Sequence, residues 1–220
     1  SLPMTCPDYE SACAAYIKRA LDPDNHPDIR KANQGILSNP MDLDLVAQMI
    51  AGSMEPDLFN LQQQQYKIMS ADYELRHVSR KFPLTEFSET VFNMRIDDQP
   101  TIPAGDYIDE VRCMERYKMI LSSQSTDADG EPVKQYFFRH DKIMDFFIVQ
   151  SFLNNDDRPV EYMNDPRFRG VYFLLAYLLP WDAAMALREE LIQYAADTKD
   201  VSVSHKFIQL IRDRKHLTAA

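Results

Sequence analysis

The residues best suited to chemistry in this chain lie where a strand is expected to end and a helix to begin. The segment Tyr136-Phe137-Phe138-Arg139-His140-Asp141 places a strand-prone aromatic run directly before a histidine and an aspartate, and a mostly apolar stretch follows. The first turn of a helix has free backbone N–H groups and a partial positive charge, so it can receive a phosphate. An adjacent imidazole can donate a further hydrogen bond. His140 is therefore a candidate phosphate-binding residue; the alternative is that His140 or Asp141 only caps the helix.

The other reactive residue types form no catalytic or metal-binding pattern. The sequence has no GxxxxGK[ST], GxGxxG, GxSxG or HExxH motif, so we assign no catalytic residue and do not expect this chain alone to be an enzyme. We assign no metal ligand either, because the cysteines lack CxxC spacing and are interpreted as small apolar packing residues. These are Cys6, Cys13 and Cys113. Among the histidines only His140 lies in a restrictive segment, and the others are interpreted as surface or loop residues: His26, His77, His205 and His216.

Two segments resemble motifs of one known family. Arg139-His140-Asp141 is similar to the Met-His-Asp box at the end of the winged helix in signalling NTPases of the STAND class, the NACHT and NB-ARC proteins, with Arg139 where these families often have Met. About 100 residues upstream, Leu37-Ser38-Asn39-Pro40-Met41-Asp42-Leu43 resembles the NP-x-x-L helix start in the helical domain of NACHT proteins. The resemblance covers roughly residues 5 to 155.

The resemblance implies roles for two side chains. His140 would contact the β-phosphate of bound ADP and hold a closed, inactive state, and Pro40 would pack against the adenine and ribose. This chain alone would hold no cofactor. ADP or ATP with Mg²⁺ would bind in the parent protein, whose phosphate loop, Mg²⁺-binding acidic residues and sensor arginine belong to an α/β core preceding Ser1. The start Ser-Leu-Pro-Met, without an initiator methionine, fits a piece of such a longer protein.

Hydrophobic periodicity predicts a mainly α fold with a single β-hairpin. Helical spacing of apolar residues predicts four helices before residue 79, including Pro27 to Leu37, one that begins at Pro40 and is closed by Gly52, and one from about Pro56 to Tyr73. We assign residues 1–78 to a helical domain.

The middle of the chain has the element order of a winged helix. Two helices are followed by a hairpin, in which residues 118–122 pair with residues 133–139 across an exposed turn at Asp127 to Gly130. The next helix begins near His140, and its apolar character nearly all round predicts burial on more than one side. We assign residues 79–155 to a winged-helix domain and residues 156–220, which again read as helical only, to a second helical region that starts a helical or solenoid domain.

Charge and hydropathy disfavour two classes of partner. With 24 basic and 34 acidic side chains the net charge is −10, which opposes binding to nucleic acid. The candidate recognition helix, from Asp106 to Lys118, also carries four acidic against three basic side chains. The longest mostly apolar run, Val171 to Trp181, has 11 residues and contains Pro180, whereas a membrane span needs about 20. We therefore expect neither nucleic acid nor a membrane as partner.

Two functions from different classes fit these observations. The first is the regulatory lid of a cytoplasmic, NACHT-like STAND NTPase, an ADP/ATP-dependent switch whose partners are the preceding nucleotide-binding core and, on activation, other proteins or further copies of itself. The alternative is a stand-alone helical and winged-helix module for protein interaction. A transcription regulator is less consistent with the charge.

Overall fold

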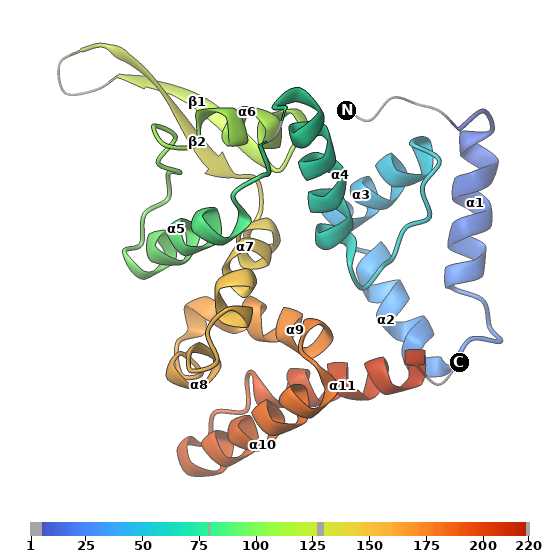
Figure 1. The fold of residues 1–220 in the computed structure, drawn as a ribbon. Coiled ribbons are helices and arrows are strands. Elements are labelled where there is room, and N and C mark those ends of the chain that lie inside the picture. Colours follow the sequence, from blue (N-terminus) through green and yellow to red (C-terminus); the bar gives the residue numbers. More distant parts are fainter. Residues whose placement is uncertain (1–5, 79, 127–129, 219–220) are drawn as a thin grey trace. The chain divides into compact units, whose positions relative to one another are not determined.

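The computed structural model describes residues 6–78, 80–126 and 130–218, with side chains to residue 214. Among these residues the chain forms 11 α-helices, one 3₁₀ turn and one antiparallel pair of strands (Figure 1). The predicted mainly α fold with one hairpin is confirmed. The chain divides into two compact units: residues up to Lys67 with residues from Gln209 onward, and Ile68–Ile208. These units differ from the three predicted domains, whose limits stay predictions.

The first unit contains helices whose limits follow from local signals. They are α1 (Tyr9–Ala20), α2 (Pro27–Leu37), α3 (Pro40–Ala51) and the start of α4 (Leu61–Arg76). Both α2 and α3 have proline in the first turn, where a missing N–H costs nothing, and a side chain that caps the helix start. Gly52 follows the last residue of α3. The predicted limits of α2 and α3 are therefore confirmed.

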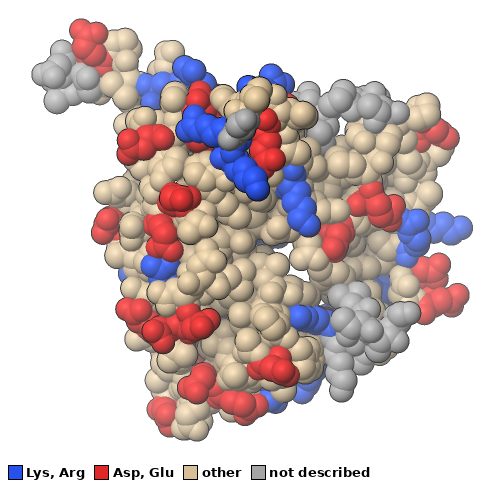
Figure 2. All heavy atoms as spheres, viewed as in Figure 1, with Lys and Arg blue, Asp and Glu red and all other residues tan. Residues whose placement is uncertain are grey.

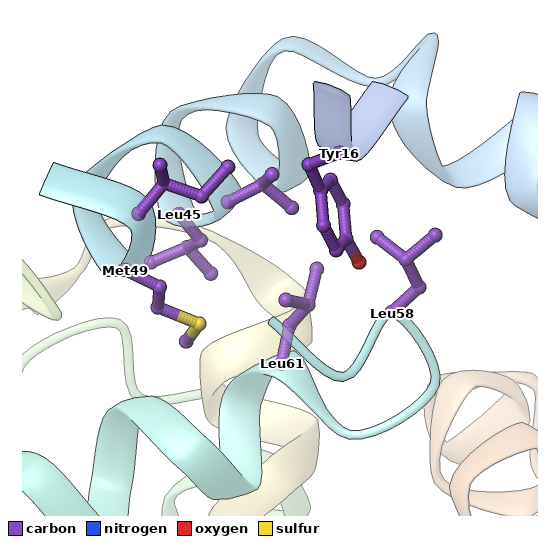
Figure 3. Close-up of a cluster of buried hydrophobic side chains, with 7 residues drawn as sticks. Tyr16, Leu45, Met49, Leu58 and Leu61 are labelled. Atoms are coloured by element: carbon purple, nitrogen blue, oxygen red, sulfur yellow. The ribbon is translucent and has the colours of Figure 1, made fainter. Parts of the chain in front are cut away.

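A small hydrophobic cluster holds this unit together (Figure 3). It joins one residue of α1, four of α3, one of the following loop and the first of α4, namely Tyr16, Leu45, Val46, Met49, Ile50, Leu58 and Leu61. The Tyr16 hydroxyl donates to the Pro56 carbonyl oxygen at 2.9 Å, which satisfies a polar group inside the cluster.

The helix α4 begins five residues later than predicted, at Leu61 rather than Pro56. The Asp57 carboxylate accepts a hydrogen bond from the Phe59 amide at 3.1 Å and another from the Asn60 side chain at 2.7 Å. Such side-chain bonds to the local backbone compete with helix formation. Residues 55–60 therefore form a loop, and the helix starts after it.

The second unit begins with the predicted order of helices and hairpin. Its elements are the rest of α4, α5 (Leu84–Ile96), α6 (Ile108–Arg116), β1 (Ile120–Thr126), β2 (Pro132–Phe138) and α7 (Asp141–Leu153). The strands pair antiparallel from Ile120 opposite Phe138 to Thr126 opposite Pro132. The predicted hairpin is confirmed, but the first strand begins two residues later than the predicted residue 118 and continues four residues beyond 122. Gly130 is exposed with φ of +87°, as a turn glycine should be, while Asp127–Asp129 lie outside the described residues.

The same unit continues through the following helices: α8 (Arg158–Glu161), the 3₁₀ turn (Pro166–Phe168), α9 (Arg169–Leu178), α10 (Trp181–Thr198) and the first residues of α11 (Ser204–Thr218). At its centre lies α7, which packs against both α5 and α9. Eight of the 13 residues of α7 are buried, so the predicted burial on more than one side is confirmed. No helix in the described part of the chain is long and apolar enough to cross a membrane.

Candidate functional site

The start of α7 is the candidate site. After β2, the Arg139 amide donates to the Met119 carbonyl oxygen at 3.1 Å, which ties the end of the hairpin to the residue before β1. His140 is then the extended residue that precedes the helix, with φ of −152° and ψ of 149°. Its carbonyl oxygen accepts from the amides of Ile143 and Met144, at 3.1 and 3.4 Å. The backbone of His140 is thus fixed by the turn into α7.

The imidazole of His140 is exposed and makes no capping hydrogen bond to the helix. His140 is thus the N-cap residue of α7 through its backbone alone, and the alternative that it caps the helix holds for its carbonyl oxygen but not for its side chain. Asp141 is the first residue of the helix and is also exposed. Its carboxylate interacts favourably with the positive end of the helix dipole, and an incoming phosphate would compete with it for that position.

His26 and His77 lie in loops, as predicted, but His140 is not the only histidine whose side chain is restricted. His26 caps α2, since its Nδ1 accepts from the Asp28 amide at 3.4 Å. His77 stacks on Tyr73 with ring centroids 4.5 Å apart. His205 is exposed as expected, and the side chain of His216 lies outside the described residues.

Pro40, the second predicted site residue, lies in the first unit at the start of α3 and is exposed. The preceding Asn39 side chain accepts from the amides of Met41 at 3.0 Å and Asp42 at 3.3 Å. These two bonds fix the helix start, so the proline ring is presented on a rigid backbone. His140 belongs to the second unit.

Aromatic packing holds the first half of α7 in place. The Phe147 ring lies 5.0 Å from that of Phe87 on α5, 6.2 Å from Phe82 and 5.8 Å from Phe138 at the end of β2. Further along the helix, Phe152 packs 5.5 Å from Phe168. Because these contacts involve the hairpin, α5 and the turn before α9, the direction of α7 and the position of His140 are set by the core of the unit.

A buried carboxylate lies one turn inside α7. Asp145 accepts from Arg95 of α5 at 3.3 Å. Its Oδ2 lies where Gly170 of α9 has no side chain: a Cβ there would meet this oxygen at 1.9 Å. Burial raises the pKa of Asp145 to about 7, against a smaller opposing effect of the Arg95 charge.

Two arginines link α5 to the start of α9 around this carboxylate. Arg95 donates to the Arg167 carbonyl oxygen at 2.6 Å, and Arg167 donates back to the carbonyl oxygens of Arg95 and Ile96 at 3.1 and 2.9 Å. The Asp165 carboxylate forms an ion pair with the Arg167 guanidinium, with 2.7 Å between Oδ2 and Nη2. Sequence reasoning did not find this network, because its members are separated by 50 and 72 residues.

The surface of α6 differs from the sequence-based expectation. Glu110, counted among its four acidic side chains, is only 1% exposed and accepts from the Tyr73 hydroxyl at 2.5 Å and from Arg80 at 3.1 Å. Without Glu110, acidic and basic side chains from Asp106 to Lys118 balance, three against three. Figure 2 shows Lys and Arg gathered over this region, in a face that elsewhere carries mainly Asp and Glu. The charge argument against nucleic acid therefore rests on the whole chain and not on this helix.

Two of the three cysteines behave as packing residues, as predicted, while Cys6 is half-buried. Cys113 is fully buried, which raises the pKa of its thiol, and Cys13 packs against the hydrophobic cluster of the first unit. Within the described ranges no group of three or more His, Cys, Asp and Glu side chains could hold a metal ion.

No protein-family model matches the chain, and neither does any of the curated proteins or solved structures compared with it.

Proposed function

We propose that this chain is the regulatory lid of a cytoplasmic, NACHT-like STAND NTPase, which ADP holds closed and ATP opens. In this proposal His140 donates a hydrogen bond to the β-phosphate of ADP, and Pro40 packs on the adenine and ribose. The observation that carries it is the exposed His140 imidazole, which makes no capping hydrogen bond and stands at the N-terminus of a helix directly after the hairpin.

Rigid support of α7 favours a switching role. A contact can bias two states only if it differs in strength between them, which requires a donor held at a defined position. The backbone bonds of His140 and the packing of Phe147 provide that position. A displacement of α7 would also move Asp145 and so disturb its hydrogen bond from Arg95 of α5 and its close contact with Gly170 of α9.

The nucleotide chemistry itself is assigned to the rest of the parent protein. In the proposal, the preceding core supplies the phosphate loop and the Mg²⁺ ligands, and exchange of ADP for ATP frees the lid for self-assembly or for protein partners. A stand-alone interaction module is the second candidate. A coding sequence for a phosphate loop within the preceding few hundred residues supports the lid, whereas a natural start codon near Ser1 refutes it.

The test of the proposal is His140→Ala in the full-length protein. A hydrogen bond to a charged group contributes about 1.5–3 kcal/mol, so the variant should release ADP about 10- to 100-fold faster and assemble without its trigger. His205→Ala is the matched control, since His205 is an exposed histidine of the same unit. Melting temperature is measured with and without ADP. Loss of stability with normal ADP retention would rule out the sensor role of His140.

A further inference from the structure

The strand β1 has an outer edge that no other strand among the described residues covers, since β1 pairs with β2 on one side only. Residues 121–124 and Thr126 are exposed, and Figure 1 shows the hairpin extending away from the helices of its unit. A two-stranded hairpin is at best marginally stable on its own in water, and further strands stabilise it. The outer edge of β1 is therefore a candidate surface for another strand.

The register of the hairpin shows which backbone groups lie on this edge. In an antiparallel pair, residues that bond across the pair alternate with residues whose N–H and C=O groups point outward. The Tyr136 carbonyl oxygen accepts from the Ile102 amide at 2.8 Å, outside the hairpin, so Tyr136 and the opposite residue, Ser122, are of the outward kind. Gln124 and Thr126 follow at the same spacing. In the part of the chain that the structure describes, the backbone groups of Ser122, Gln124 and Thr126 have no hydrogen-bond partner.

The two outer edges of the hairpin differ in the features that prevent pairing. Proteins protect an exposed edge with proline, with charged side chains or with a covering segment. The outer edge of β2 has all three, because Pro132 lacks an N–H, Lys134 is charged and the Ile102 amide bonds to the strand. In contrast, β1 contains neither proline nor a charged residue. The edge of the hairpin that is open to another strand is thus that of β1.

The side chains of β1 fit a second copy of the same strand. A two-fold symmetric contact brings the same surface of both copies together. With Gln124 opposite Gln124 of the second copy, Ser122 lies opposite Thr126, so no like charges face each other and hydroxyl groups meet, which stabilises strand pairs. The exposed Lys118, just before β1, then lies near the far end of the other hairpin, where Glu131 is exposed. Antiparallel pairing therefore brings opposite charges together.

We propose that two copies of this chain associate through β1, edge to edge and antiparallel, with the two Gln124 residues opposite each other at the two-fold axis. Ser122, Gln124 and Thr126 exchange backbone hydrogen bonds with the second copy, and the two hairpins form one sheet. The contact is limited to the seven residues of β1, so we expect a weak dimer with a dissociation constant on the order of 0.1–1 mM. Neither His140 nor Pro40 belongs to β1, so this association is independent of the nucleotide proposal.

Sedimentation equilibrium of the chain, from about 10 µM to about 1 mM, measures the association. The wild type should change from monomer towards dimer over this range. Gln124→Pro removes the outward N–H but keeps the bonds between β1 and β2, because Gln124 and the opposite Lys134 are of the outward kind. Each copy then loses one backbone donor to the other, so association should weaken at least about fivefold.

Charged variants at position 124 test the two-fold pairing. Gln124→Lys and Gln124→Glu each place like charges opposite each other at the axis, so each variant alone should associate at least about threefold more weakly than the wild type. An equimolar mixture of the two should form a heterodimer at least as tightly as the wild type dimerises, because opposite charges then face each other. Gln135→Lys is the matched control, since Gln135 lies on β2 opposite Ser123, and it should leave association unchanged.

Three results would overturn the proposal. They are a chain that stays monomeric at about 1 mM, equal effects of Gln124→Lys and Gln135→Lys, or a mixture of the two charged variants that associates no more tightly than each variant alone. A monomeric chain would leave the edge of β1 to an extended segment of a different protein. If Gln124→Pro alters the circular dichroism spectrum of the chain, the charged variants decide alone.

Discussion

Asp145 should make the stability of the second unit depend on pH near neutrality. Its carboxyl is buried between α7 and α9, and burial raises its pKa from 3.8 to about 7. Arg95 opposes this rise and Asp141 adds a smaller one. Because one pKa unit corresponds to 1.36 kcal/mol, the rise amounts to about 4 kcal/mol between the protonated and ionised forms.

The sign follows from proton binding. Between pH 4 and 7 the folded state holds a proton on Asp145 that the unfolded state has lost, so the stability contributed by the protonated form is complete below about pH 4 and is lost as pH rises through about 7. Asp145→Asn imitates the protonated carboxyl, and its amide oxygen still accepts from Arg95. The free energy of unfolding of the variant, relative to that of the wild type, should therefore increase by about 3 kcal/mol as the pH is raised from 5 to 8.

Urea unfolding followed by Trp181 fluorescence measures this difference. Trp181 is the only tryptophan of the sequence and lies at the start of α10, in the same unit as Asp145. Asp197→Asn, an exposed aspartate of α10, is the control and should show no such pH dependence relative to the wild type. A constant difference between Asp145→Asn and the wild type from pH 5 to 8, or an Asp145 carboxyl that titrates near 4 by NMR, would refute the reasoning.

Three further predictions concern the helix contacts and the nucleotide. Gly170→Ala should destabilise the second unit by about 1–3 kcal/mol in the Trp181 assay, because its Cβ would lie 1.9 Å from Asp145 Oδ2, whereas Gly105→Ala, in the same unit with open space around it, should not; equal stabilities would contradict the close packing. Asn39→Ala should destabilise α3 by about 1 kcal/mol in urea unfolding followed by circular dichroism, through loss of its two capping bonds, and an unchanged midpoint would show that they contribute nothing. The chain alone should bind ADP weakly or not at all, because one helix terminus and one histidine supply few hydrogen bonds; micromolar binding by calorimetry would show that the phosphate site is misplaced.

The helix limits that could be predicted are those set by residues at the helix ends themselves. Pro27, Pro40 and Gly52 mark the ends of α2 and α3 through backbone geometry alone, so neighbouring residues suffice to read them. The late start of α4 could not be predicted from the spacing of Leu58 and Leu61, because that spacing fits a helix while the Asp57 side chain stabilises a turn there.

Polar groups with distant partners could not be predicted. In the sequence Glu110 has the features of a surface charge, and only the fold brings Tyr73 and Arg80 to it from 37 and 30 residues away. Asn33 of α2 is likewise buried, and its side chain donates to the carbonyl oxygen of Ala20, 13 residues away at the end of α1. For the candidate site, the sequence located His140 at the start of a buried helix, but the lack of a capping bond from its side chain required the side-chain geometry.

The reciprocal hydrogen bonds between Arg95 and Arg167 cannot form until the ribosome has added the second residue. The two residues are 72 positions apart, so at about 5–20 residues per second the ribosome adds Arg167 about 4–14 s after Arg95. Once α7 (Asp141–Leu153) has been made, it lacks α9 (Arg169–Leu178) until the chain has grown further, and the apolar side chains that α7 packs against α9 stay accessible to chaperones or to other nascent chains. A pause in translation before residue 167 would lengthen this exposure, whereas a pause after α9 has emerged would not.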